Sequence, residues 1–193
     1  RAEKSNFIQM QLARSQLSAL QAQMNPHFLF NSISSIQNFI MSNKREEAYD
    51  YLTSFSKLIR RTLNNSRSQL ISLAEEIETI KLYMQLEQRR YNNRFDFYVE
   101  VSAEIVLEEV LLPASLIQPL LENAVWHGIA PLGPEKRGLI TLEITAEDSF
   151  LRITVVDNGV GIQTSNSRNE SLAIAIIEER LTILNHNSAE KRD

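Results

Sequence analysis

The sequence predicts an α+β protein in which an antiparallel helical hairpin precedes an α/β sandwich. All five glycines lie at Gly128 or later, and the long stretch before them is rich in Leu, Gln, Glu, Ser and Arg, which favour helix. The last third combines glycines and prolines with alternating β-branched residues, a pattern typical of strands and loops. We therefore expect a helical domain at residues 1–66 and a second domain at residues 67–193.

Composition excludes several classes of protein. The 193 residues are 43% hydrophobic and 23% charged, as in soluble globular proteins, and the net charge of -4 does not suggest direct nucleic-acid binding. The absence of cysteine excludes disulfides and thiolate metal sites and fits a reducing cytoplasm. No apolar run reaches the roughly 18–20 residues that span a bilayer. Because the first residues already follow a helical pattern, we expect the chain to be part of a longer protein.

Two helices are expected in the first domain. The first runs from about Phe7 to Met41, and Ser42-Asn43 breaks it. Glu46 and Glu47 then suit the N-terminus of a second helix. Two antiparallel helices cannot bury all of the apolar face, so a homodimeric four-helix bundle is expected, with a monomeric hairpin packed on the rest of the chain as the alternative. The apolar face of the second helix consists of Ala48, Tyr51, Leu52, Phe55, Leu58, Ile59, Thr62 and Leu63.

A proline and a histidine stand inside the first predicted helix. Pro26 removes a backbone N–H and costs roughly 3 kcal/mol in a helix interior, so a local kink is expected. His27 is the only nearby side chain that can be neutral and nucleophilic at pH 7. Residues 28–30 give it an apolar frame, and Asn25 and Asn31 offer amide partners. The histidine is either an ordinary core residue or a phosphoryl acceptor whose ring nitrogen attacks a γ-phosphate.

The second domain begins after a polar hinge at residues 64–68. Ser72 and Glu75 have the spacing of a capping box, and Asn92-Asn93 should end the helix that follows. Helices and strands then alternate in a way that predicts a sheet with helices on one face. The remaining elements expected are a strand at 95–101, a helix from about Ala114, strands at 139–146 and 150–156, and a helix at about 172–185.

Three features of this domain could carry chemistry. Asn123 and His127 are four residues apart near a helix end, where an amide oxygen suits Mg²⁺ and His127 either contributes to the site or caps the helix. Asp157 follows an apolar strand and could accept a hydrogen bond from an exocyclic amine, while Gly159 and Gly161 would let the backbone approach a planar ligand. A tight turn is the alternative. The polar run at 163–171 is either a lid over phosphates or a surface loop.

Taken together, three motifs give the chain a family resemblance. They are Gln21-Ala22-Gln23-Met24-Asn25-Pro26-His27-Phe28-Leu29-Phe30-Asn31, Gln118-Pro119-Leu120-Leu121-Glu122-Asn123-Ala124-Val125-Trp126-His127-Gly128 and Asp157-Asn158-Gly159-Val160-Gly161-Ile162. In this order they resemble the LytS-like sensor histidine kinases of bacterial two-component systems. The resemblance extends from about Gln16 to Leu184.

The resemblance implies a dimerisation and phosphoacceptor hairpin followed by a Bergerat-type ATP-binding domain. It implies that His27 is the phosphoacceptor, that Asn123 is the Mg²⁺ ligand, and that Asp157 recognises the adenine amino group of ATP in a pocket shaped by Gly159 and Gly161. The implied partner is a response regulator that accepts the phosphoryl group on an aspartate, often one of the LytTR type. The implied location is the cytoplasmic part of an inner-membrane protein, with the membrane reached only through upstream segments.

The chain also departs from that family. Ser171, Leu172, Ala173 and Ile174 stand where relatives often have a second glycine motif, which would make the phosphate-facing helix end bulkier. Phe28 stands where many histidine kinases have an acidic residue. The chain stops at Asp193, before the strands that complete the sheet in relatives. The altered glycine motif favours an alternative function, a dimeric signalling scaffold with a degenerate nucleotide domain, whereas the intact His27, Asn123 and Asp157 oppose it.

Overall fold

The computed structural model describes residues 26–65, 68, 70–148, 150–161, 177–178 and 181–182. The chain divides into two compact units, Arg1–Gln69 and Leu70–Asp193. No helix in these described ranges is both long enough and apolar enough to cross a membrane. The expected lid at 163–171, the altered motif at 171–174 and most of the last predicted helix lie outside the described residues.

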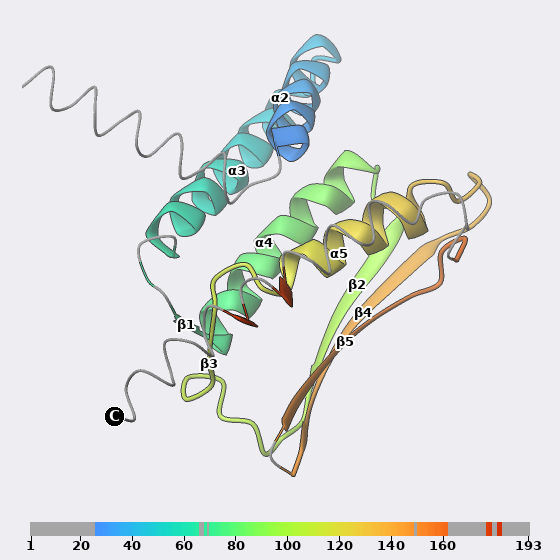
Figure 1. Ribbon diagram of the computed structural model, residues 1–193. Helices are drawn as coiled ribbons and strands as arrows, with labels where there is room; N and C mark the ends of the chain where they lie inside the picture. Colours follow the sequence, from blue (N-terminus) through green and yellow to red (C-terminus); the bar gives the residue numbers. More distant parts are fainter. Residues whose placement is uncertain are drawn as a thin grey trace, which may run out of the picture. The chain divides into compact units, whose positions relative to one another are not determined.

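The first unit contains an antiparallel helical hairpin, as the sequence predicts (Figure 1). Helix α2 spans Pro26–Met41 and helix α3 spans Arg45–Asn65. Asn43 makes the turn with a φ of 56°, a left-handed conformation that asparagine tolerates better than most residues. Glu46 and Glu47 lie in the first turn of α3. The residues before Pro26 are outside the described ranges, so the kink expected there stays a prediction.

Aromatic rings hold the two helices of the hairpin together. Phe28 is buried, and its ring centroid lies 6.2 Å from that of Phe55. Tyr51 is fully buried, 5.7 Å from the ring of Phe39, and its hydroxyl donates to Ser32 Oγ at 3.3 Å. The hairpin therefore has a core of its own that joins both helices.

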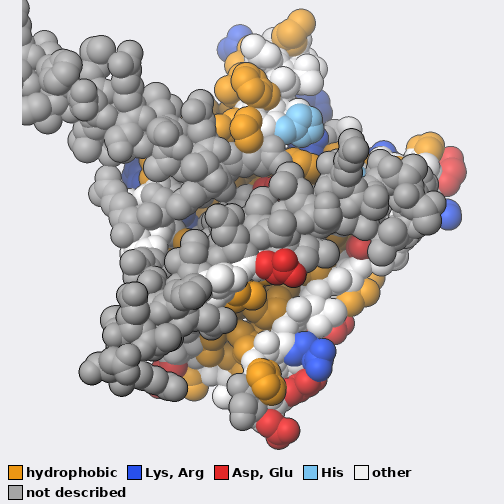
Figure 2. All heavy atoms as spheres, in the orientation of Figure 1, with side chains coloured by type: hydrophobic (Ala, Val, Ile, Leu, Met, Phe, Trp, Pro, Cys, Tyr) orange, Lys and Arg blue, Asp and Glu red, His pale blue; other side chains and the backbone are white. Residues whose placement is uncertain are grey.

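The hairpin also exposes large apolar side chains. Phe30 is 71% exposed and Met41 83% exposed, and Figure 2 shows hydrophobic atoms at the surface of this unit. Leu52, expected on the inward face of its helix, is 47% exposed. Such a surface is the kind that a second copy of the hairpin would cover, but the expected four-helix bundle stays a prediction. The other large exposed apolar residues of the hairpin are Ile33, Ile40 and Tyr49.

The second unit is built on a three-stranded sheet in the order β2-β4-β5. Strand β2 (Phe95–Val101) runs parallel to β4 (Gly138–Glu147), with Phe95 opposite Gly138. Strand β5 (Phe150–Asp157) returns antiparallel to β4, with Asp157 opposite Ile140. Strands β1 (Ile71–Ser72) and β3 (Leu111–Leu112) form a second, small antiparallel sheet.

Helices cover one face of this sheet (Figure 1). Ile140, Leu142 and Ile144 alternate along β4 and are fully buried, while the residues between them are less buried. This period of two is the expected signature of a strand with one packed face. The second unit is thus a two-layer arrangement of helices on a mixed sheet, and the prediction of helices on one face of a sheet is confirmed.

Helix α4 (Leu73–Arg90) has the termini that the sequence predicts. The Ser72 hydroxyl accepts a hydrogen bond from the Glu75 backbone N–H at 3.2 Å, and a Glu75 carboxylate oxygen accepts one from the Ser72 N–H at 3.1 Å. This reciprocal pair is a complete capping box. Asn92 and Asn93, both with positive φ, follow the end of the helix.

Helix α5 begins later than predicted. It spans Gln118–Asn123 rather than starting near Ala114, and Pro119 falls in its first turn, where proline is tolerated. The preceding segment is held instead by Glu76 of α4, whose carboxylate accepts hydrogen bonds from Ser115 N at 2.9 Å and Ile117 N at 3.1 Å. Ser115 has a φ of 57°, which interrupts any helix at this point. The helix start is therefore set by a contact from a distant element.

We expect Glu76→Ala to lower the free energy of unfolding by about 3 kcal/mol, because two buried backbone donors would lose a charged acceptor. Glu76 is only 1% exposed, so water cannot easily replace it. Urea denaturation followed by circular dichroism measures the change. Glu78→Ala, at an exposed position of the same helix, is the matched control. Equal stabilities of the two variants would contradict this role of Glu76.

Candidate functional site

Asp157 is the last residue of β5, and the residue after it fixes the turn. Asn158 N donates to Leu139 O at 3.1 Å, and the Asn158 side-chain oxygen accepts from Leu139 N at 2.7 Å. The amide nitrogen of the same side chain donates to Arg137 O at 3.2 Å. Asn158 thus continues the sheet pairing through its side chain. The sequence reasoning gave this residue no role, although asparagine often makes such local bonds in turns.

Arg137, which Asn158 contacts, is also bonded to strand β2. Nε and Nη2 of Arg137 each donate to the Asp96 carboxylate at 2.6 Å. These hydrogen bonds lower the pKa of Asp96. Because the pKa of Asp96 is lower in the folded protein, the Asp96–Arg137 pair stabilises the fold at pH values above the ordinary pKa of an aspartate. This stabilisation is lost as the pH falls through the pKa that Asp96 has in the folded protein. At neutral pH the pair is therefore intact.

The Asp157 carboxylate is oriented by the loop that follows it. Oδ1 accepts a hydrogen bond from Gly159 N at 2.9 Å, as in an Asx turn. Asp157 is exposed, and Oδ2 has no hydrogen-bond partner among the residues that the structure describes. A carboxylate oxygen in this position can accept from an N–H of a ligand.

A π-helix brings a second element against this loop. After α5 the chain continues as η1 (Ala124–Ile129), in which Ala130 N donates to Val125 O at 2.8 Å, five residues back. Single π turns of this kind are rare and are frequent at functional sites. Val160 N donates to Gly128 O at 3.2 Å, so the end of η1 and the glycine loop are bonded directly.

Gly128 and Gly159 make this close approach possible. A Cβ on Gly159 would lie 2.4 Å from the Gly128 backbone, and a Cβ on Gly128 would lie 2.5 Å from Asp157 Oδ1. Gly161 is a glycine for a different reason, since its φ of 74° is left-handed. Gly128 was quoted in a motif but given no role by sequence reasoning. The sequence did contain an indication of such a role: glycine in a helical stretch costs roughly 1 kcal/mol relative to alanine, so its presence at position 128 calls for a structural reason.

Asn123 and His127 lie on either side of the change from α to π helix. Both are half-buried, and neither side chain forms a hydrogen bond with another residue in the described ranges. Because π bonds span one more residue than α bonds, one turn after Asn123 falls between His127 and Gly128. The structure therefore brings Asp157, Gly159 and Gly128 into contact. Asn123 and His127 are near Gly128 along the chain, and their side chains have no direct bond to Asp157 or Gly159.

Glu122, the residue before Asn123, is close to the buried Tyr83. The neighbouring Glu122 accepts a hydrogen bond from Gln118 Nε2 at 2.9 Å. Burial raises the pKa of Tyr83 well above its usual range, and the carboxylates of Glu87 and Glu122 raise it further. Tyr83 therefore stays neutral at physiological pH.

His27 lies on α2 in the first unit and is exposed. Asn31 is one turn further along, and its side-chain Nδ2 lies 3.1 Å from His27 Nδ1 and 3.4 Å from Nε2. The amide partner expected from the sequence is thus present, while Asn25 is outside the described ranges. Since an asparagine side chain can present either its nitrogen or its oxygen, Asn31 can hold the imidazole in either neutral tautomer.

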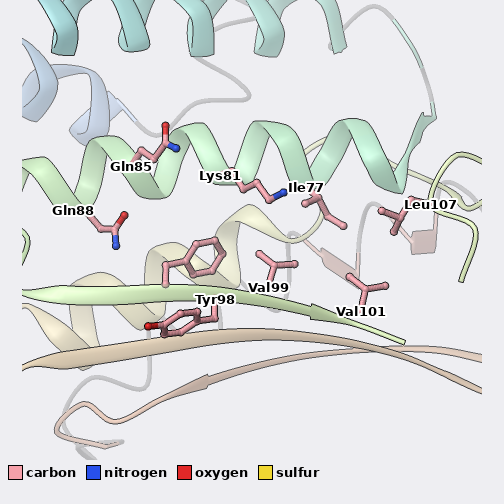
Figure 3. A pocket seen from close by; sticks show the side chains of 9 residues that line it. Ile77, Lys81, Gln85, Gln88, Tyr98, Val99, Val101 and Leu107 are labelled. Carbon is pink, nitrogen blue, oxygen red and sulfur yellow. The ribbon is translucent and has the colours of Figure 1, made fainter. Parts of the chain in front are cut away.

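A separate groove of about 400 Å³ lies between α4 and β2 (Figure 3). Lys81, Gln85 and Gln88 come from the helix. Val99 and Val101 point toward the helix from the strand, whereas Tyr98 lies on the other side of the strand. The residues that line it include no carboxylate, so it lacks an acceptor of the Asp157 kind. Within the described residues there is also no group of three or more Asp, Glu or His side chains that could hold a metal ion alone.

Comparisons with known proteins place most of the chain among related sequences. The histidine kinase family model matches residues 15–95. The chain is 34% identical over 151 residues to the sensor protein LytS of Staphylococcus epidermidis, covering 78% of this chain and 25% of that protein. It is 37% identical over 153 residues to the sensor histidine kinase/phosphatase LytS of Staphylococcus aureus, covering the same shares. The chain thus spans about a quarter of the length of these curated relatives.

A solved structure is also similar to the chain. This is the histidine kinase domain of the blue-light activated histidine kinase of Erythrobacter litoralis, which is 17% identical in sequence. The TM-score is 0.45, and the alignment covers 87% of this chain and 81% of that one.

Proposed function

Because the chain belongs to the histidine kinase family, with LytS sensor proteins among its relatives, we propose that it is the kinase region of a bacterial two-component sensor. In this proposal it binds ATP, phosphorylates itself on His27 and passes the phosphoryl group to an aspartate of a response regulator. The observation that carries the proposal is the exposed imidazole of His27 with an amide partner one helical turn away.

The nucleotide is proposed to bind at the contact between β5 and η1. Asp157 Oδ2 accepts from the exocyclic amine of adenine, and Gly159 and Gly161 shape the pocket. Asn123 contributes a half-buried amide oxygen toward Mg²⁺, and His127 borders the same site. Mg²⁺ would be held by the Asn123 amide oxygen together with oxygens of the nucleotide phosphates, which commonly contribute to Mg²⁺ sites. Bound Mg²⁺ neutralises charge on the phosphates.

The chemical step is an in-line transfer. The ring nitrogen of His27 that carries no proton attacks the γ-phosphorus, and the bond from that phosphorus to the bridging oxygen breaks. The electron pair leaves on the β-phosphate of ADP, and the new N–P bond makes phosphohistidine. Asn31 orients the ring, because its side-chain amide lies 3.1 Å from His27 Nδ1, within hydrogen-bond distance.

Two further parts of the proposal concern partners. A second copy of the chain covers the exposed apolar residues of α2 and completes a four-helix bundle, as Phe30 and Met41 suggest. A response regulator, of the LytTR type in the resemblance, receives the phosphoryl group. The full-length protein is an inner-membrane sensor in which this chain faces the cytoplasm.

The experiment that tests the proposal is incubation of the purified chain with Mg²⁺ and γ-labelled ATP. We expect label that is stable in alkali and lost in acid, as phosphohistidine is. Acid-stable label would overturn the histidine assignment. Absence of label, together with nucleotide binding weaker than millimolar in calorimetry, would instead support the signalling scaffold that the substitutions at 171–174 favour.

We expect Asn31→Ala to lower the rate of autophosphorylation about tenfold, because one hydrogen bond that orients the imidazole is lost. Single-turnover labelling with saturating ATP measures the rate. Asn38→Ala, at an exposed position of the same helix, is the matched control and should label at the wild-type rate. An Asn31→Ala protein that labels as fast as the control would show that Asn31 does not orient the ring.

A further inference from the structure

Gly128 is a glycine because of space, not because of its backbone conformation. Only Gly161 among the glycines has a positive φ, so Gly128 needs no special dihedral angles. A Cβ there would lie 2.5 Å from Asp157 Oδ1 and 2.9 Å from Cγ of the same side chain. Real Cβ atoms do not approach other atoms so closely. The volume that an alanine methyl group would fill is therefore occupied by the Asp157 carboxylate.

The carboxylate is confined on two sides. The buried backbone of Gly128 lies against it, and Gly159 N donates to Oδ1 at 2.9 Å. The loop cannot retreat easily, because Val160 N bonds to Gly128 O at 3.2 Å and Gly159 packs on the same residue. Oδ1 is therefore fixed toward the loop, and Oδ2 is the oxygen left to accept from a ligand.

We propose that Gly128 is a positioning residue that sets the base selectivity of this site for a purine with an exocyclic amine. The inference rests on the proposed ATP-binding function. Gly128 acts through Asp157: its missing side chain gives the carboxylate room for the one orientation that points Oδ2 outward. A purine with an amine at its 6-position donates to Oδ2, whereas a purine with hydrogen there gains nothing from it.

The two glycines of the contact should respond differently to added side chains. At Gly159 a Cβ would meet the backbone of Gly128 at 2.4 Å, so the loop and helix would have to separate. At Gly128 the Cβ would meet the carboxylate of a short side chain, which can rotate away while the backbone stays in place. Gly128→Ala should therefore change recognition more than stability.

The test measures the affinities of the full chain for two nucleotides, ATP and purine riboside triphosphate, which lacks the 6-amino group. Calorimetry with Mg²⁺ gives both dissociation constants. We expect the wild type to prefer ATP by about 10- to 100-fold, the range of one hydrogen bond to a charged group. In Gly128→Ala the affinity for ATP falls about tenfold or more, the affinity for the analogue hardly changes, and the preference largely disappears.

Two other glycines give matched controls. Gly133→Ala adds a Cβ that has no atom within 4 Å, and it should leave both affinities unchanged. Gly138→Ala places a Cβ 2.8 Å from Ile129 and Phe95 in the core. It should lower the melting temperature, and any loss of affinity should be equal for the two nucleotides. Gly138→Ala therefore shows how a loss of stability alone affects the preference for ATP over the analogue.

The outcomes separate the inference from the proposed function. If Gly128→Ala keeps the wild-type preference for ATP, or weakens both nucleotides equally, Gly128 does not position Asp157 and the inference is wrong. If the wild type binds neither nucleotide, the ATP-binding proposal fails and the inference falls with it. Wild-type binding with no preference between the two would contradict the role of Asp157 in base recognition.

Discussion

Replacing His27 with glutamine is expected to abolish autophosphorylation. Glutamine is similar in size and polar, but its amide nitrogen has no lone pair available to attack phosphorus. Because His27 is exposed on α2, the substitution should leave the core of the hairpin intact. Labelling with γ-labelled ATP, followed by separation of the protein from free nucleotide, should give no signal above background.

The chain offers a matched control for this substitution. His186 is one of three histidines and was given no role, so His186→Gln makes the same chemical change elsewhere and should label normally. Circular dichroism and the affinity for ATP should be the same for His27→Gln and the wild type, since His27 is not part of the proposed nucleotide site. Residual acid-labile label on His27→Gln would show that another residue is the phosphoacceptor.

Replacing Asp157 with asparagine is expected to weaken ATP binding about 100-fold without unfolding the protein. The asparagine oxygen can still accept from Gly159 N, so the turn is preserved. An NH₂ group then replaces Oδ2, and a donor faces the donor amine of adenine. Isothermal calorimetry gives the dissociation constant, and thermal denaturation should show a melting temperature close to that of the wild type.

Asp148→Asn is the matched control for Asp157→Asn. Asp148 is exposed in the turn between β4 and β5, and its φ of 47° is a conformation that asparagine also tolerates. This variant should bind ATP like the wild type. A folded Asp157→Asn protein with the wild-type affinity for ATP would remove Asp157 from base recognition, and with it the role assigned to Gly128.

Local patterns in the sequence were sufficient for most of the elements. The alternation from Phe95 to Val101 predicted β2 at its observed bounds, because a strand with one packed face repeats every two residues. Ser72 and Glu75 predicted the start of α4, because a capping box depends only on residues three apart. The position of Asp157 at the end of a strand was equally visible, since an apolar run stops there.

Contacts between distant segments decided the rest. The sequence placed the start of α5 near Ala114, but Glu76 from another helix holds Ser115 and Ile117, and the helix begins at Gln118. No local pattern contains that contact. The roles of His27, Asn123, His127, Gly159 and Gly161 remain proposals, and the His27→Gln experiment tests the first of them.

The residues for the candidate site are thus determined by the sequence, and their mutual orientation by the tertiary structure. The sequence alone supplies a carboxylate after a strand and a helix that ends in glycine. Only the folded chain puts Gly128 against Asp157, more than two dozen residues away, so that the Asp157 carboxylate occupies the space that a Cβ on Gly128 would need. The physical reason is that propensity and capping act within a few residues, whereas packing acts between whichever surfaces the fold brings together.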